Sequence, residues 1–338
     1  MAPTLNNKLI IHKLAADLGL RSSGAPVEAI VNYCRRKMKS FLRDFPECST
    51  PAQLADFAAN KLGTVLVEIH SDGDLGDIRR DYLDRGERGF VNLEDELAGE
   101  VYGVTLKRQH RNDWEQPYVS VIDCRGRKAQ RKYHTKWHEL GHLFILTDQG
   151  RLAFRRTHDP AHPKSAEESI VDVIAGDFSF YEPMLRPFMK GEISFEKIEA
   201  IRCEHCPEAS IYSAILNLSK IWPVPCIWVE AALAHKKGEQ SGNQESFSFK
   251  LIPAMKLRAV HVSANTRARE AGLTMIPNWR VPKSSIIHRV FEAAQHDEAI
   301  EDLAAWESSD GGRLKARRVR VRAKKVGDSV HALVMPVN

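Results

Sequence analysis

The sequence of 338 residues has no hydrophobic run long enough to cross a membrane and no recognisable export signal. A transmembrane helix needs about 20 apolar residues, and no run here approaches the roughly 18 that mark a candidate. The first ten residues, MAPTLNNKLI, lack the basic, apolar and small-residue regions of a secretory signal peptide. We therefore expect a cytoplasmic protein with no membrane partner.

Cysteine is sparse, and the chain has no second CxxC pair, no internal repeat and no low-complexity tract. Scattered cysteines in a large, unsecreted chain argue against a disulfide framework. Cys203 and Cys206, with His205 between them, resemble half of a zinc or redox site, but a structural zinc takes four ligands. Cys226 could be a further ligand, but its spacing from Cys206 is arbitrary. Because Cys203 and Cys206 fall at apolar positions of a helical pattern, we expect buried structural thiols, with redox sensing and metal binding as alternatives.

The charge is nearly balanced. Lys and Arg number 49, Asp and Glu 44, and the net charge of +5 is mildly basic. Such a surface permits an acidic or nucleic-acid partner but does not require one. The basic run at 125–136 is therefore interpreted as a solvated loop edge. The run at 314–325 is interpreted as a strand with one solvent-exposed face. Binding of an acidic substrate or of nucleic acid is the alternative for both runs.

Hydrophobic periodicity predicts a mixed α+β chain. Helical spacing occurs in these segments: 27–44, 51–62, 165–180, 194–206, 209–222 and 284–296. Alternating or β-branched runs predict strands in these: 64–70, 100–108, 116–123, 258–264, 317–323 and 331–337. We expect 71–98 to be a short helix within surface loops, 147–164 to be a loop, and 236–248 to be a linker. The pattern predicts an α+β core in which a short antiparallel sheet packs on the helix that contains residue 138.

The segment HELGH at 138–142 has the spacing of a metal-binding helix. Residues four apart share one face of a helix, so the imidazoles of His138 and His142 can reach one metal ion. Glu139 points toward the same cavity and can take a proton from metal-bound water. Trp137 and Gly141 lie on the side that packs on the core. Because glycine weakens a helix, Gly141 predicts a close approach by another element.

A catalytic zinc usually has three protein ligands and one open position, so a third ligand must come from elsewhere. Glu168 and Asp172 share one face of the next predicted helix. We predict that Glu168 binds the metal and that Asp172 accepts the spare N–H of a ligand histidine. Ser165 and Glu168 also fit a capping box, in which Glu168 bonds back to the helix start. The alternative ligands are then Glu167, His158 and His162.

These two helices resemble those of the ImmA/IrrE metallopeptidases. The resemblance rests on RKYHTKWHELGHLFIL and, after a loop, EESIVDVIAGDF. In that family a second helix carries a glutamate, an Asn or Asp four residues on, and an alanine and a phenylalanine nearby. In this sequence the corresponding residues are Glu168, Asp172 and Ala175, and the phenylalanine, Phe178, is displaced by one position. The resemblance covers roughly residues 27–225 and is strongest at the two helices.

The resemblance implies a gluzincin-like, and hence zincin-like, metallopeptidase core, placed at 1–190. It implies a helical segment resembling a helix-turn-helix, placed at 191–235, and a small α+β, GAF-like domain at 248–338. It further implies a zinc-dependent endopeptidase that cleaves a helix-turn-helix repressor in a stress or mobile-element response. The family's apolar tail LLMP is FSFYEPML here, which leaves the substrate open.

The mechanism expected from the residues uses Zn²⁺ on His138, His142 and Glu168, with Glu139 as the general base. Candidates for a second oxyanion donor are Tyr133, His158, His162 and Tyr181. Two other functions compete with proteolysis: a non-catalytic zinc-binding module that recognises a partner, and a transcription regulator that binds DNA through 193–222.

Overall fold

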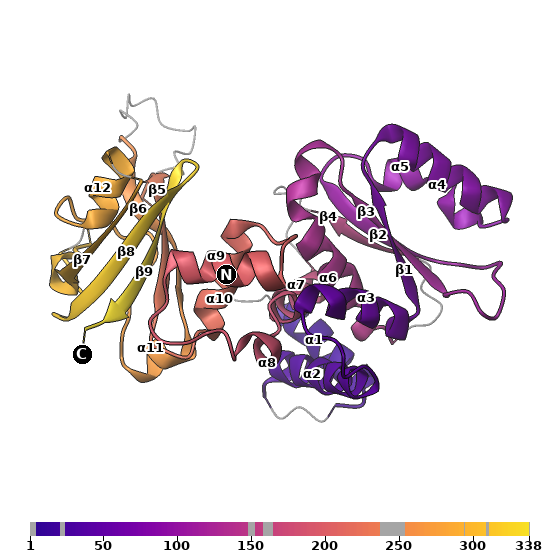
Figure 1. Ribbon diagram of the computed structural model, residues 1–338, viewed down its shortest axis with the longest axis horizontal. Helices are drawn as coiled ribbons and strands as arrows, with labels where there is room; N and C mark the ends of the chain where they lie inside the picture. The colour runs from indigo at the N-terminus through magenta and orange to yellow at the C-terminus, as the bar shows by residue number, and fades with distance from the viewer. Residues whose placement is uncertain are drawn as a thin grey trace. The chain divides into compact units, whose positions relative to one another are not determined.

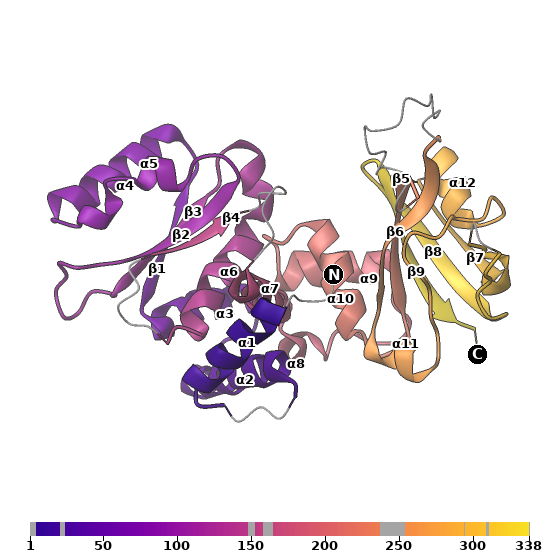
Figure 2. The same ribbon diagram turned by 180° about the vertical axis from the view of Figure 1, so that it is seen from behind.

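A computed structural model of the chain describes residues 5–20, 24–147, 153–157, 165–236, 254–293, 295–308 and 311–337. Over these residues the chain is mixed α+β, which confirms the predicted class. It divides into two compact units, drawn from opposite sides in Figures 1 and 2. The first comprises Met1–Leu185 and Arg202–Ser210, and the second Arg186–Ile201 and Ile211–Asn338.

Three helices open the first unit: α1 (Leu5–Asp17), α2 (Pro26–Asp44) and α3 (Pro51–Leu62). The last two form where the periodicity predicts them. Helix α3 begins after Thr50, whose side chain accepts a hydrogen bond from the Gln53 amide. It ends at Gly63, whose φ of 78° is the left-handed conformation that glycine adopts without strain.

The first unit contains a four-stranded sheet in the order β1-β3-β2-β4. Its strands are β1 (Thr64–Ile69), β2 (Val101–Lys107), β3 (Tyr118–Asp123) and β4 (Ala153–Thr157). Strand β2 is antiparallel to both neighbours, but β1 and β3 run parallel. The expectation of an antiparallel sheet is therefore wrong for that pair, because the chain crosses one face of the sheet between β1 and β2.

That crossing is more helical than predicted. It contains α4 (Asp72–Asp84), the 3₁₀ turn η1 (Arg88–Phe90) and α5 (Leu93–Glu96), where we expected one short helix within loops. A capping box between Ser71 and Asp74 starts α4. Strand β4 is a second correction, since it lies within 147–164, which we expected to be a loop. Its pairing with β2 stabilises an extended segment that the local sequence does not mark.

Helices cover both faces of this sheet (Figure 1). Helices α4 and α5 lie on one side, and α3 and α6 (Lys132–Phe144) on the other. The side under α4 and α5 is apolar, with Val104, Leu106, Val119 and Val121 packed on Leu75, Phe90, Leu93 and Leu97. Successive side chains of a strand point to opposite faces, so the intervening residues of β2 and β3 face α6.

Helix α7 (Ala166–Ser179) crosses α6 on the side away from the sheet and is followed by α8 (Glu182–Leu185). Trp137 of α6 packs on Phe178 with ring centroids 5.9 Å apart. A Cβ on Gly141 would lie 3.0 Å from a methyl group of Val171. The close approach predicted from Gly141 is therefore confirmed, and α7 is the approaching element.

The second unit contains a five-stranded antiparallel sheet in the order β6-β5-β9-β8-β7. Its strands are β5 (Ile227–Ala234), β6 (Lys256–Ala264), β7 (His296–Asp302), β8 (Arg318–Val326) and β9 (Ser329–Pro336). The accompanying helices and turns are α9 (Phe195–His205), α10 (Ile211–Ile221), α11 (Thr266–Glu270), α12 (Ile286–Glu292) and η3 (Leu303–Ala305). Helix α9 contributes residues to both units.

The boundaries differ from the expected parts. Strand β5 lies within 191–235, expected to be helical, yet it pairs with β6 and β9 inside the C-terminal sheet. Its sequence IWVEAALA is too short and too apolar for its alternation to be clear, and pairing with two neighbours decides its conformation. The linker expected at 236–248, apart from Lys236, lies outside the described residues. Among the helices that the structure describes, none is long and apolar enough to span a membrane.

Candidate metal centre

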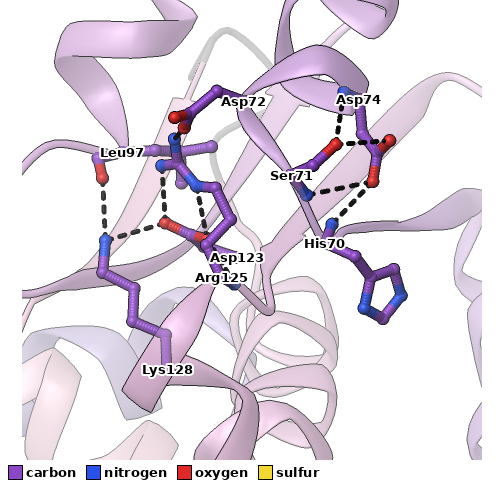
Figure 3. A network of polar contacts seen from close by, with 8 residues as sticks. All are labelled: His70, Ser71, Asp72, Asp74, Leu97, Asp123, Arg125 and Lys128. Atoms are coloured by element: carbon purple, nitrogen blue, oxygen red, sulfur yellow. Dashed lines mark hydrogen bonds and ion pairs between the residues drawn. The ribbon is translucent and has the colours of Figure 1, made fainter.

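A buried aspartate fixes the connection that leads from the sheet into α6. Asp123, at the end of β3, is 1% exposed and accepts hydrogen bonds from Arg125 and Lys128 (Figure 3). Lys128 also donates to the carbonyl oxygen of Leu97, and Arg125 reaches Asp72 at the start of α4. Burial alone would raise the pKa of Asp123, but these donors outweigh it and lower that pKa. The connection that leads into α6 is thereby held at the end of β3.

The remaining lysines of the basic run also have carboxylate partners. Lys132 and Lys136 both pair with Glu68 of β1 and with Glu208. The run was expected to be a loop edge, but it forms the 3₁₀ turn η2 (Gly126–Arg131) and the start of α6, and Lys128, Lys132 and Lys136 are all paired with carboxylates.

Three side chains from α6 and α7 meet at one point. His138 and His142 are 1% and 0% exposed, and both direct Nε2 at the carboxylate of Glu168. His138 Nε2 lies 3.0 Å from Glu168 Oε2, and His142 Nε2 lies 3.1 Å from Glu168 Oε1. One atom from each residue falls within 4.8 Å of the others, so the three could hold a metal ion. The structure thus brings together the three ligands predicted from the sequence.

Each histidine has a second carboxylate on its other ring nitrogen. Asp172 Oδ1 lies 3.0 Å from His138 Nδ1, where the sequence placed it. Glu167 Oε1 lies 3.2 Å from His142 Nδ1. A carboxylate at Nδ1 holds the proton there and leaves the Nε2 lone pair for a metal.

Glu168 faces the histidines and not the start of its own helix. The Ser165 hydroxyl accepts a hydrogen bond of 3.1 Å from the Glu168 amide, so half of the capping box is present. The Glu168 carboxylate itself lies between the two imidazoles. Of the alternative ligands, Glu167 lies at Nδ1 of His142, while His158 and His162 lie outside the described residues.

His134 is a neighbour that the sequence analysis missed. Its Nε2 lies 3.6 Å from Asp172 Oδ1, and its ring centroid lies 6.4 Å from that of His138. The four-residue spacing between His134 and His138 is the signal that could have identified it.

Glu139 is buried directly above strand β2. Its Oε2 accepts a hydrogen bond of 2.8 Å from Thr105, and its Oε1 has no hydrogen-bond partner among the described residues. A Cβ on Gly103 would lie 3.0 Å from Oε1 and 2.8 Å from a methyl carbon of Thr135. Glycine at 103 therefore leaves the room that Glu139 occupies, and neither Thr105 nor Gly103 was singled out from the sequence.

The charges of the cluster favour a cation. Burial raises the pKa of Glu139, which opposes its ionisation. Burial alone would lower the pKa of His142, but hydrogen bonds to Glu167 and Glu168 raise it to about 9. Burial would likewise raise the pKa of Glu168, but the two imidazoles lower it to about 2. The carboxylates of Glu167, Glu168 and Asp172 contact the two buried imidazoles, and this donor set fits a divalent cation.

The two tyrosines proposed as oxyanion donors lie elsewhere. The Tyr133 hydroxyl is buried and donates a 2.7 Å hydrogen bond to the carbonyl oxygen of Ser179. Tyr181 lines a different pocket, together with Arg35 and Asp177. Neither hydroxyl is placed beside the cluster, so the described residues do not supply the expected second donor from these positions.

The thiols divide into two kinds. Cys206 is fully buried, which confirms the expectation for this residue. Cys226 is fully buried as well, and burial raises the pKa of both to about 12. Cys203 is exposed, so the expectation that it lies in the core is wrong. It comes two residues after the buried Ile201 and therefore lies on the other side of α9.

Comparison with protein-family models gives no match for the chain, and comparison with curated proteins gives no significant match. Support for a metal centre therefore comes from the sequence pattern of α6 and α7 and from the geometry that these helices produce.

Proposed function

We propose that the chain is a zinc-dependent endopeptidase in which His138, His142 and Glu168 bind zinc and Glu139 is the general base. One observation carries this proposal: both Nε2 atoms lie within 3.1 Å of the same Glu168 carboxylate, next to the buried carboxylate of Glu139. Two imidazoles and one carboxylate suit zinc and leave a coordination position open for chemistry.

Bound zinc supplies a Lewis acid that polarises the scissile carbonyl and lowers the pKa of water toward neutrality. Glu139 takes the proton of the attacking water at Oε1, the oxygen without a hydrogen-bond partner among the described residues. It then passes that proton to the leaving amine. Burial raises the pKa of Glu139 and so brings it nearer to working pH, where one carboxyl group can both accept and donate a proton.

The fold around the site supports a zincin-like core of the ImmA/IrrE type. The mixed sheet packs on α6, and α7 brings the third ligand, in the order that the resemblance implies. The antiparallel sheet of the second unit, with α10 and α12 packed on it, supports a small GAF-like sensor domain. We propose a helix-turn-helix repressor as the substrate, cleaved in a stress or mobile-element response.

Direct DNA binding through α9 and α10 has less support. Helix α10 carries one basic residue, Lys220, and buries Ala214, Ile215 and Leu218. Binding to DNA depends on several cations that neutralise phosphates, and α10 offers only one. A non-catalytic zinc module would not need Glu139, which is buried and tethered at one oxygen.

The test uses zinc-loaded wild-type protein and the Glu139→Gln variant, each incubated with purified helix-turn-helix repressors from the same genome. Intact-mass spectrometry identifies the products. We expect the wild type to cut one repressor at one site. We expect Glu139→Gln to keep its zinc and to cut about 10²- to 10⁴-fold more slowly, because the general base is lost.

Equal cleavage by wild type and Glu139→Gln would refute the general-base assignment. A zinc-loaded wild type that binds a repressor and cuts none would favour the non-catalytic module. Salt-dependent binding of duplex DNA by the wild-type protein in the absence of a repressor would favour a transcription regulator that binds DNA directly.

A further inference from the structure

Three hydroxyl groups form a buried line across the sheet beneath Glu139. Thr64 of β1, Ser120 of β3 and Thr105 of β2 are 3%, 0% and 0% exposed. The oxygens of Thr64 and Ser120 are 2.9 Å apart, and those of Ser120 and Thr105 are 2.8 Å apart. The line ends at Glu139 Oε2, 2.8 Å from Thr105 Oγ1.

The register of the strands produces this line. Thr105 and Ser120 are directly opposite across β2 and β3, so their side chains share one face. Strand β1 pairs with the other edge of β3 and places Thr64 next to Ser120. Three residues distant in sequence thus meet on adjacent strands, facing the helix that carries the general base.

Counting protons gives the line a direction. The Thr105 hydroxyl donates to Glu139 Oε2, and a hydroxyl has a single proton to donate. The Thr105 oxygen then accepts from Ser120, and the Ser120 oxygen accepts from Thr64. All three hydroxyls point their protons toward Glu139, and such a chain polarises each successive donor.

Buried hydroxyl groups cost stability unless they are hydrogen bonded, and valine or alanine would fill these positions without that requirement. Among the residues that the structure describes, none of the three hydroxyls is hydrogen bonded to a predicted metal ligand. Beyond the line itself, they form the hydrogen bond to Glu139 and a longer one of 3.4 Å from Thr64 to the carbonyl oxygen of Val65.

We propose that Thr105 is a positioning residue for Glu139, and that the hydrogen bonds from Ser120 to Thr105 and from Thr64 to Ser120 hold the Thr105 hydroxyl in place. This inference rests on the proposed function, since it concerns the general base of that reaction. Thr105 holds Oε2 against the sheet, so the carboxylate keeps one orientation and Oε1 remains the atom that accepts the proton. Gly103, on the same strand, leaves the space in which Oε1 lies.

The test compares two pairs of full-length variants. Thr105→Val removes the hydroxyl and keeps the shape, whereas Thr105→Ser keeps the hydroxyl. Ser120→Ala breaks the line, whereas Ser219→Ala removes an equally buried hydroxyl that bonds only within α10. Zinc content, the rate of repressor cleavage and the position of Glu139 in crystal structures are measured for each.

We expect every variant to bind one zinc per chain. Thr105→Val should lower kcat about 10- to 100-fold with KM unchanged, because a misplaced catalytic group loses this order of rate. Thr105→Ser should restore kcat to within about threefold, as expected if the hydroxyl and not the methyl group matters. Ser120→Ala should lower kcat less than Thr105→Val does, and Ser219→Ala should leave it unchanged. In crystals, Glu139 should move or lose order in Thr105→Val and keep its place in Thr105→Ser.

An unmoved Glu139 in Thr105→Val would overturn the proposal, as would a Thr105→Ser variant as slow as Thr105→Val. If the wild type binds zinc but cleaves nothing, the proposed function fails. The crystal structures then still decide whether Thr105 positions Glu139.

Discussion

One helix-covered face of each sheet can be compared, the face under α6 in the first unit and the face under α12 in the second, and these two faces differ in polarity. In the second unit, the face that packs with α12 is apolar: Ile227, Val229, Ala231, Val319, Val321, Ala323, Val330, Ala332 and Val334. In the first unit, the face under α6 carries Thr64, Thr105 and Ser120, with Gly103 at the closest approach. Both faces are buried to a similar degree, but only one of them needs hydrogen bonds to be stable.

The apolar face is what a structural core requires, whereas the polar face is typical of a functional site. An apolar face stabilises its unit by removing area from water and requires no particular geometry of donors. A polar face under a helix costs stability unless each group finds its partner, and natural sequences keep such departures mainly at functional sites. The hydroxyl-bearing face is the one under α6, the helix that carries His138 and His142 of the candidate metal cluster.

The largest effect on stability is expected from a cavity at the apolar face of the second sheet. Ile287 of α12 is fully buried against the second sheet. Ile287→Ala should lower the free energy of unfolding of that unit by about 2 to 5 kcal/mol, through lost burial and a cavity. Denaturant unfolding followed by tryptophan fluorescence measures this, since Trp222, Trp228, Trp279 and Trp306 lie there. Zinc content should not change, and a parallel loss of zinc would contradict the division of roles.

A smaller effect is expected from the buried charge that anchors α6. Asp123→Asn should lower the free energy of unfolding at pH 7 by about 1.5 to 3 kcal/mol, because hydrogen bonds to a charged group are lost. The pKa of Asp123 is lowered in the folded protein, so its contribution is complete above the unfolded pKa of about 4. It is lost as pH falls through the lower, folded pKa. Circular dichroism in denaturant at pH 7 and pH 3 should show a smaller difference between wild type and variant at pH 3, and a constant difference would contradict this.

The smallest effects are expected from placing a hydroxyl in the apolar face or removing one from the polar face. Val321→Thr places an unpaired hydroxyl in the apolar face and should cost about 1 to 3 kcal/mol. Thr64→Val removes the far end of the hydroxyl line and should change stability by less than about 1 kcal/mol, because Ser120 keeps its bond to Thr105. Thermal unfolding compares the two. Equal costs would show that the faces do not differ as described.

The sequence predicted the site better than the fold around it. His138, Glu139 and His142 follow from the four-residue period of one helix, and Glu168 and Asp172 from the same period on the next. Local periodicity therefore identifies most of the cluster. Thr105, Ser120 and Gly103 could not be found this way, because their role depends on strand register and on which face meets α6.

The errors in the fold have the same origin. The parallel pairing of β1 with β3, and strands β4 and β5, depend on contacts between distant segments. Cys203 was misplaced because a helical pattern with few apolar residues allows more than one buried face. Segments with strong periodicity or clear caps, such as α2 and α3, lie where the sequence places them.

The central claim is that α6 and α7 form a zinc centre, and the zinc content of purified protein tests it most directly. Elemental analysis should be made on wild type, His142→Ala and, as a control, His331→Ala, which removes a fully buried histidine of the second unit. We predict one zinc per chain in the wild type and the control, and none in His142→Ala. A well-folded wild type that takes up no zinc when it is supplied, or a His142→Ala variant that keeps it, would contradict the account.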